Sequence, residues 1–128
     1  MLLLKEFSIF LFEGVFAMSW LYLVLAGISE LGWPLGFKMS AMAQAQNNTM
    51  HTVLWLGLAL LSMVTSMAFL YLAQRHIHMG TAYIVWTGIG GMGTALVGIF
   101  FFQEPATLIR LLSLIAILAG LIGLSLAR

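Results

Sequence analysis

The stretch that decides the fold is "TVLWLGLALLSMVTSMAFLYLA", residues 52–73, in which no side chain is charged. A helix advances about 1.5 Å per residue, so a run of this length crosses the ~30 Å hydrocarbon core of a lipid bilayer. Soluble proteins seldom contain so long an apolar segment. We therefore predict a membrane-spanning helix here and ask whether the rest of the chain agrees.

The composition of the whole chain supports a membrane protein. Of its 128 residues, 62% are hydrophobic and 7% are charged, whereas soluble domains are about 45–50% apolar and about 25% charged. The formal net charge is +1 and no basic run occurs, which disfavours a nucleic-acid partner. The absence of cysteine excludes disulfides, thiolate metal sites and a cysteine nucleophile.

The few polar residues divide the chain into apolar segments separated by short connections. Short connections force neighbouring helices to run antiparallel. We therefore predict an all-α integral membrane protein with four transmembrane helices per subunit. The predicted spans are about 18–38, 52–74, 79–102 and 106–127, which together make one four-helix domain over residues 18–128.

A glycine cluster lies inside the third predicted span. The stretch "WTGIGGMG", residues 86–93, spells G-x-G-x-x-G, but a dinucleotide site needs a preceding strand and an acid about 20 residues later. Neither is present, and we predict no cofactor. Small residues instead allow membrane helices to approach closely, and glycine weakens a helix. We predict that Gly88, Gly90 and Gly91 combine close packing with a hinge.

Glu30 is the only acid in the first predicted span. A carboxylate exposed to lipid in the membrane interior is costly, so Glu30 is expected to face protein or a water-filled cavity. Such residues commonly serve function. The alternative is a carboxyl group that only holds a neighbouring helix by a hydrogen bond.

Helical spacing suggests which residues surround Glu30. Gly27 and Trp33 share the helix face of Glu30. The second and third predicted spans also each carry a face of polar or aromatic residues. A carboxylate, aromatic rings and hydroxyl groups together favour a site for an organic cation, which binds through charge and cation–π attraction. The candidates from the other spans are Ser62, Met63, Ser66, Tyr83, Trp86 and Gly90.

Taken together, residues Met18 to Arg128 resemble the small multidrug resistance family of four-helix, proton-coupled exporters. The resemblance is carried by "MSWLYLVLAGISELGWPLGFKMS" (18–40), "GTAYIVWTGIGGMGTALVGIFFFQEP" (80–105) and "IAILAGLIGL" (115–124). The E-x-x-W of Glu30 and Trp33 and the W-T-G-I-G of residues 86–90 resemble the guanidinium-exporter branch.

The resemblance implies a mechanism and roles. Family members act as antiparallel homodimers whose paired glutamates bind either a cation or protons, so Glu30 is implied as the shared proton and substrate site. The partners are then a small organic cation, protons, the lipid bilayer and a second copy. The implied pocket residues are Gly27, Trp33, Ser66, Tyr83 and Trp86, and the implied hinge residues are Gly88, Gly90 and Gly91.

Three features depart from the family pattern. Residues 1–17 have no counterpart and are an interfacial helix, a weak signal sequence or an artefact of an upstream start codon before Met18. The loop "MSAMAQAQNNTM" (39–50) is several residues longer than usual. Pro34 follows Trp33 and is expected to kink the helix beside Glu30, which puts the substrate preference in doubt.

Two functions other than guanidinium export are open. An exporter of quaternary ammonium or other lipophilic multidrug cations needs aromatic surface, whereas guanidinium also needs fixed acceptors for its N–H groups. A non-transporting membrane adaptor needs neither a pocket nor a hinge. No Ser/His/Asp arrangement indicates an enzyme. His76 and His78 do not share a helix face, so no metal site is predicted.

Charge counting bears on assembly. With four spans, Lys5, Arg75 and Arg128 lie on one side of the membrane and Lys38 and Arg110 on the other. Orientation follows the Lys and Arg excess, which is almost nil here. We predict insertion in both orientations in a bacterial inner membrane and an antiparallel homodimer, against a parallel dimer or a heterodimer. Small-xxx-small tracks place the dimer contact at Ala116, Ala119, Gly120 and Gly123.

Overall fold

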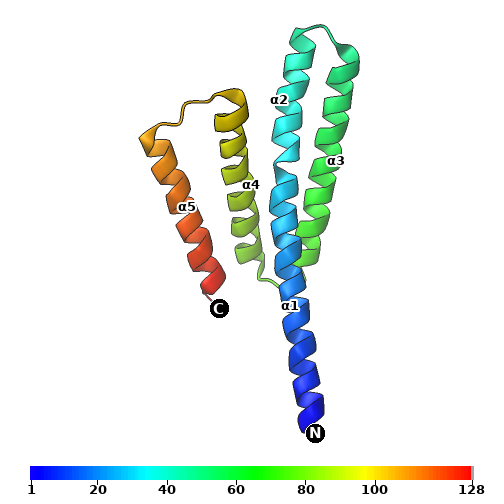
Figure 1. The fold of residues 1–128 in the computed structure, drawn as a ribbon. Coiled ribbons are helices and arrows are strands. Elements are labelled where there is room, and N and C mark those ends of the chain that lie inside the picture. The colour runs from blue at the N-terminus through cyan, green and yellow to red at the C-terminus, as the bar shows by residue number, and fades with distance from the viewer. Residues whose placement is uncertain (128) are drawn as a thin grey trace.

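The computed structural model describes residues 1–127, and the side chains of all of these except those at positions 2–4, 7 and 10. The described chain folds into helices only, so the predicted all-α class is confirmed (Figure 1). Four segments are long and apolar enough to cross a membrane: Leu11–Ala45, Thr49–Gln74, Met79–Phe102 and Leu108–Leu126. The helices are α1 (Leu2–Glu30), α2 (Gly32–Ala45), α3 (Thr49–Gln74), α4 (Met79–Phe102) and α5 (Leu108–Leu126).

The first span consists of two helices joined at Leu31. Pro34 has no N–H group, so it cannot donate the helical hydrogen bond that Glu30 would otherwise accept. Leu31 itself keeps right-handed helical angles, φ −65° and ψ −27°. The backbone therefore continues nearly straight from α1 into α2 (Figure 1). The helix is interrupted directly after Glu30, but the kink predicted from Pro34 does not occur, because Leu31 keeps helical angles.

The N-terminal part of the first span differs from the expected bounds. The prediction began the first helix at about residue 18, whereas α1 runs without interruption from Leu2 to Glu30. Residues 2–17 therefore continue the helix that forms the first span. The physical reason is that this stretch lacks proline and holds only one glycine, Gly14, which is too weak a breaker to end a helix.

The α2–α3 hairpin is tightly built at both its base and its tip. At the tip, Asn47 has a left-handed φ of 56° and turns the chain. The Asn48 side chain then caps α3 by accepting a hydrogen bond from the His51 N–H at 3.1 Å. Nearer the base, a Cβ added at Gly36 would lie 2.8 Å from the Ala59 Cβ, so α2 and α3 pack in close contact.

The connection from α4 to α5 is fixed by an ion pair. Gln103 ends α4 with a left-handed φ of 54°, and Arg110 binds the Glu104 carboxylate at 2.6 Å. Thr107 caps α5 by accepting from the Arg110 N–H at 3.4 Å. The cap is the reason that α5 begins at Leu108 and not at 106 as predicted.

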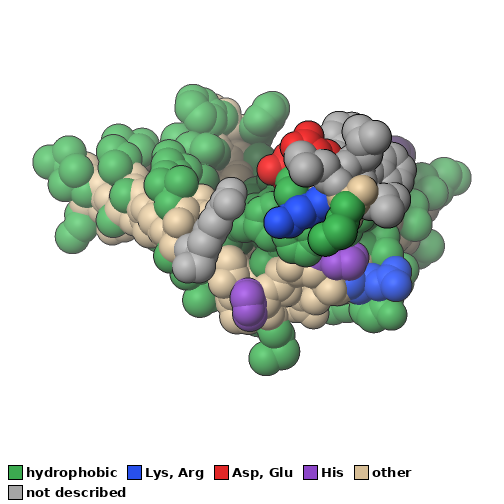
Figure 2. All heavy atoms as spheres, turned by 90° about the horizontal axis from the view of Figure 1, so that it is seen from below, with side chains coloured by type: hydrophobic (Ala, Val, Ile, Leu, Met, Phe, Trp, Pro, Cys, Tyr) green, Lys and Arg blue, Asp and Glu red, His purple; other side chains and the backbone are tan. Residues whose placement is uncertain are grey.

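The core sits where α1 meets α3 and α4. Leu23, Ala26 and Ala73 are fully buried there, while α5 leans on α4 at the edge of the molecule (Figure 1). On α5, the only buried side chain among the described residues is Leu121. Most large apolar side chains are exposed, as expected for a surface that faces lipid. Seen from the N-terminal end, charged and histidine side chains gather among them (Figure 2).

Candidate functional site

Glu30 lies at the meeting point of three helices. It is the last residue of α1, and its carboxylate Oε2 accepts a hydrogen bond from the Ser66 hydroxyl of α3 at 2.8 Å. The Trp86 indole of α4 donates to the same Ser66 Oγ at 2.9 Å. Ser66 is fully buried and Trp86 is 8% exposed, so this chain of hydrogen bonds holds one edge of the carboxylate inside the protein.

Ser66 has two acceptors for a single proton. Its Oγ lies 2.8 Å from Glu30 Oε2 and also 2.8 Å from the Ala26 carbonyl oxygen. A hydroxyl group has one O–H and rotates to suit its surroundings. Its proton can therefore turn to the carboxylate when Glu30 is charged and to Ala26 when the charge is neutralised, while Trp86 holds the oxygen in place.

Glycines bring α1 and α4 together at the carboxylate. A Cβ added at Gly90 would lie 2.5 Å from the Glu30 Cγ, and one added at Gly27 would lie 2.7 Å from the Ile89 Cβ. Distances below 3.0 Å cannot be accommodated without movement. Gly90, predicted as a hinge and a pocket neighbour, thus contacts Glu30 directly, and Gly27 is the corresponding close approach on α1.

The remaining predicted pocket residues lie outside this chain of hydrogen bonds. Trp33 is half-buried and stacks edge-on against Phe37, with ring centroids 5.6 Å apart. Tyr83 is 54% exposed and its ring lies 5.3 Å from that of Trp86. Met63 is half-buried on α3. No recorded hydrogen bond joins Trp33, Tyr83 or Met63 to the carboxylate among the described side chains.

A contact that the sequence did not reveal fixes the end of α1. The Ser62 hydroxyl donates to the Ser29 carbonyl, and Gly32 lies against Ser62 with no room for a side chain. The only sequence signal was the spacing of Ser62 and Ser66, one helical turn apart. The bond satisfies a carbonyl at the interruption before Pro34, and therefore helps to hold Glu30 in position.

The predicted hinge and dimer residues have distinct surroundings. A Cβ at Gly88 would lie 2.6 Å from Leu121 of α5, whereas Gly91 has open space around it. α4 is one continuous helix in this conformation. The four small residues of α5 are all exposed, and nothing lies within 4 Å of a Cβ added at Gly120 or Gly123. These residues are Ala116, Ala119, Gly120 and Gly123.

The site offers one half-buried carboxylate, an ordered hydroxyl and an indole, all held by close helix packing. Among the described residues no group of three or more His, Cys, Asp or Glu side chains is placed to hold a metal. Glu30 is therefore the candidate group of this site for binding a cation or a proton. One face of Glu30 stays open, so a single chain surrounds a cation only in part.

Comparison with known proteins decides the family. A profile described as "Small Multidrug Resistance protein" matches residues 18–117. The chain belongs to the small multidrug resistance family. The resemblance drawn from Glu30, Trp33 and the glycine-rich stretch is thereby confirmed. The family match begins at residue 18, so residues 1–17 lie outside it.

Three relatives in this family carry the same name. The chain is 44% identical over 110 residues to the guanidinium exporter of Yersinia pestis, covering 86% of this chain and 99% of the relative. It is 41% identical over 110 residues to the guanidinium exporters of Proteus vulgaris and Salmonella typhimurium, covering 86% of this chain and 99% and 98% of theirs. Family membership and four spans identify a multi-pass protein of the bacterial inner membrane.

Proposed function

We propose that this member of the small multidrug resistance family exports guanidinium and guanidinyl compounds in exchange for protons. The observation that carries the proposal is the chain of hydrogen bonds from Trp86 through Ser66 to Glu30. It leaves Oε1 and the open face of the carboxylate for a ligand. The names of the related exporters point to the same substrate class.

The geometry of the acceptor favours a guanidinium ion. Guanidinium is planar and presents N–H donors that pair with a carboxylate in a fork, which requires the carboxylate to be fixed in orientation. Ser66 supplies that orientation, and Gly90 removes the side chain that would otherwise stand against Glu30. Aromatic rings beside the site add cation–π attraction.

Exchange with protons follows from competition at one group. A carboxyl that holds a proton has no charge with which to hold the cation, so one must leave before the other binds. The Ser66 proton can turn between Glu30 and Ala26 at each step, which keeps the buried hydroxyl paired in both states. Antiport therefore needs only that Glu30 meets each side of the membrane in turn.

The assembly that we propose is an antiparallel homodimer with dual topology. One chain leaves a face of Glu30 open and a stripe of small residues uncovered on α5. A second, inverted copy supplies another Glu30 and covers both. Because the two copies are identical and oppositely directed, alternating access becomes an exchange of conformations between them, with bending at Gly88 to Gly91.

A second candidate substrate class has its own supporting observation. Tyr83 and Trp86 form an aromatic pair with centroids 5.3 Å apart, and Tyr83 is 54% exposed. A quaternary ammonium ion has no N–H donors and binds such aromatic surface through cation–π attraction alone. It would depend on Tyr83 more than on Ser66.

Reconstitution into liposomes tests the proposal. With a proton gradient imposed, the protein is expected to drive uptake of guanidinium and to carry a tetraalkylammonium ion much more slowly. Glu30→Gln should abolish both binding and exchange while leaving the helical fold intact, since a neutral amide is easier to place in a membrane than a carboxylate. Glu30→Asp, which keeps the charge, is the matched control. Full exchange by Glu30→Gln would disprove the mechanism.

A further inference from the structure

The rod made by α1 and α2 is longer than the membrane. Its apolar part, Leu11–Ala45, has 35 residues, or about 52 Å of helix, against a hydrocarbon core of about 30 Å. The rod also extends beyond the other spans at both ends (Figure 1). Its N-terminal half passes the α3–α4 turn at one end, and the α2–α3 hairpin rises beyond the α4–α5 connection at the other (Figure 1).

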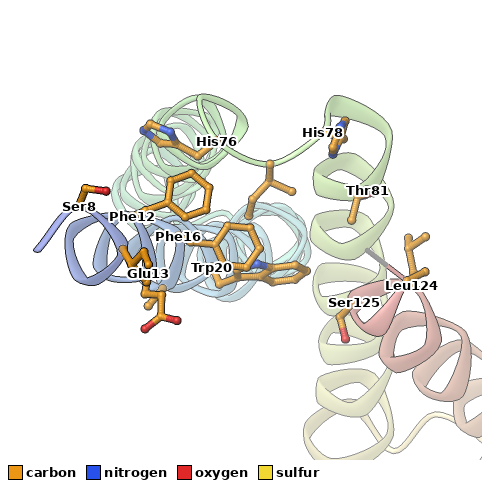
Figure 3. A pocket seen from close by; sticks show the side chains of 14 residues that line it. Ser8, Phe12, Glu13, Phe16, Trp20, His76, His78, Thr81, Leu124 and Ser125 are labelled. Atoms are coloured by element: carbon orange, nitrogen blue, oxygen red, sulfur yellow. The ribbon is translucent and has the colours of Figure 1, made fainter. Parts of the chain in front are cut away.

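A hollow of about 860 Å³ lies beside the N-terminal projection. Phe12, Phe16 and Trp20 follow one another at one-turn spacing along α1, and Figure 3 shows their rings beside one another at the hollow. Phe12 is 73% exposed. Residues of the α3–α4 turn and of the end of α5 line the hollow on its other sides. Glu13 lies on the same stretch of α1, and the rest of the lining includes His76, His78, Thr81 and Ser125.

The α2–α3 hairpin tip, at the opposite end of the molecule, carries groups that can bind the aromatic rings and the carboxylate at the hollow. Residues 39–52 carry no acid. Gln46 and Asn47 are exposed amides, and Met42 and Met50 are exposed thioethers, at 44% and 71%. Thioethers pack favourably on aromatic rings, and amide N–H groups donate to carboxylates.

Glu30 sets the register between these two projections. Glu13 lies seventeen residues before Glu30 and Asn47 lies seventeen residues after it, on a rod that stays helical through Leu31. Consider two copies that run antiparallel with their Glu30 residues at the same height. A residue a given number of positions before Glu30 in one copy then lies at the same height as the residue that number of positions after Glu30 in the partner. Glu13 then lies level with the partner's Asn47, and Phe16 with the partner's Gln44.

We propose that the hollow beside Phe12, Phe16 and Trp20 receives the α2–α3 hairpin tip of a second, inverted copy of this chain. The proposal rests on the antiparallel homodimer of the proposed function. The partner's Met50 then packs on the aromatic stripe, and the partner's Gln46 and Asn47 donate to Glu13. The contact occurs twice in the dimer, once on each side of the membrane.

Neither a single chain nor a parallel pair can make this contact. Within one chain the two projections lie at opposite ends of a rod of about 66 Å, taking about 1.5 Å per residue from Leu2 to Ala45. In a parallel pair each extension would meet the other extension. Because the family match begins at residue 18, Phe12, Glu13 and Phe16 belong to an added part of the chain, and the contact stabilises the inverted pairing without forming the transport site.

The absence of native cysteine permits a clean cross-linking test. The full-length protein carrying Phe12→Cys and Gln46→Cys is reconstituted at low density and oxidised. A covalent dimer is the expected product. Leu21→Cys with Gln46→Cys is the control for register, because Leu21 is exposed but lies nine residues further along α1. Gln46→Cys with Leu108→Cys is the control for orientation, because in an inverted pair these positions lie on opposite sides of the membrane.

The outcomes separate the docking from the function, with guanidinium export measured on every variant. A covalent dimer from Phe12→Cys with Gln46→Cys, and from neither control, supports the docking. No cross-link in a protein that still exports guanidinium overturns the docking alone. A covalent dimer from the Gln46→Cys, Leu108→Cys pair, or from Phe12→Cys by itself, indicates parallel pairing and overturns both the docking and the proposed assembly.

Discussion

At the scale of single residues, a rare acid in an apolar span indicated Glu30 as the centre of the candidate site. Ser66 and Trp86 could be chosen from helical spacing, and the structure places both in the hydrogen-bond chain that ends at Glu30. The second acceptor of Ser66 is the backbone carbonyl of Ala26. No sequence pattern reveals such a contact, because it depends on how α1 and α3 are rotated toward each other.

Ser66→Ala should weaken guanidinium binding without removing it. The change leaves the buried Trp86 N–H without its acceptor and the Glu30 carboxylate without its fixed donor. An unsatisfied buried donor costs about 1–3 kcal/mol of folding stability, so we expect lower thermal stability. A hydrogen bond to a charged group is worth about 1.5–3 kcal/mol, so loss of the bond that orients the carboxylate should lower affinity roughly tenfold to hundredfold. Ser113→Ala is the matched control, since that exposed hydroxyl bonds only the Ile109 carbonyl of its own helix. Equal affinities for Ser66→Ala and the native chain would contradict an orienting role.

At the scale of helices, the sequence predicted the four spans but not the ends of every helix. The interruption near Glu30 followed from the missing N–H of Pro34. The continuation of α1 back to Leu2 did not follow, because residues 2–17 are helix-prone whether they form their own helix or extend the span. The start of α5 was not predicted either, because both Pro105 and a cap at Thr107 can begin a helix, and the sequence does not show which of them does.

Adjacent glycines of α4 provide a matched test of packing against hinge motion. Gly90→Ala places a methyl group 2.5 Å from the Glu30 Cγ, so it should separate α4 from α1 and abolish high-affinity binding. Gly91→Ala meets open space and gains about 1 kcal/mol of helix propensity. Its binding should be unchanged, while its transport rate should fall because bending at the hinge becomes harder.

Binding by calorimetry and exchange rates in liposomes, measured on both α4 variants, separate the two roles. Normal affinity in Gly90→Ala would contradict the close packing at Glu30. An unchanged transport rate in Gly91→Ala would contradict a hinge at that position.

At the scale of the whole molecule, binding should depend on pH through competition. Protonation removes the charge of Glu30 that holds the cation, so guanidinium affinity should be highest in alkali and should fall as the pH drops. Linkage limits the slope to about tenfold per pH unit for each proton released, and to about a hundredfold if two paired carboxyls release one each. Titrations between about pH 5 and 9 measure this slope. Affinity that does not change with pH would exclude a shared carboxyl site.

The last expectation concerns orientation in the membrane, where the positive charges are nearly balanced. Lys5, Arg75 and Arg128 stand against Lys38 and Arg110. Since the Lys and Arg excess sets the direction of insertion, the native chain should insert both ways. A tag at the C-terminus should then be accessible from both sides of the membrane. Adding two lysines to the α3–α4 turn, on the side that already carries Arg75, makes the count five against two and should bias insertion toward one direction and lower export by that variant alone. Co-expression with a variant of opposite bias should restore export. A C-terminus found on only one side in cells that export guanidinium with the native chain alone would exclude the inverted pair.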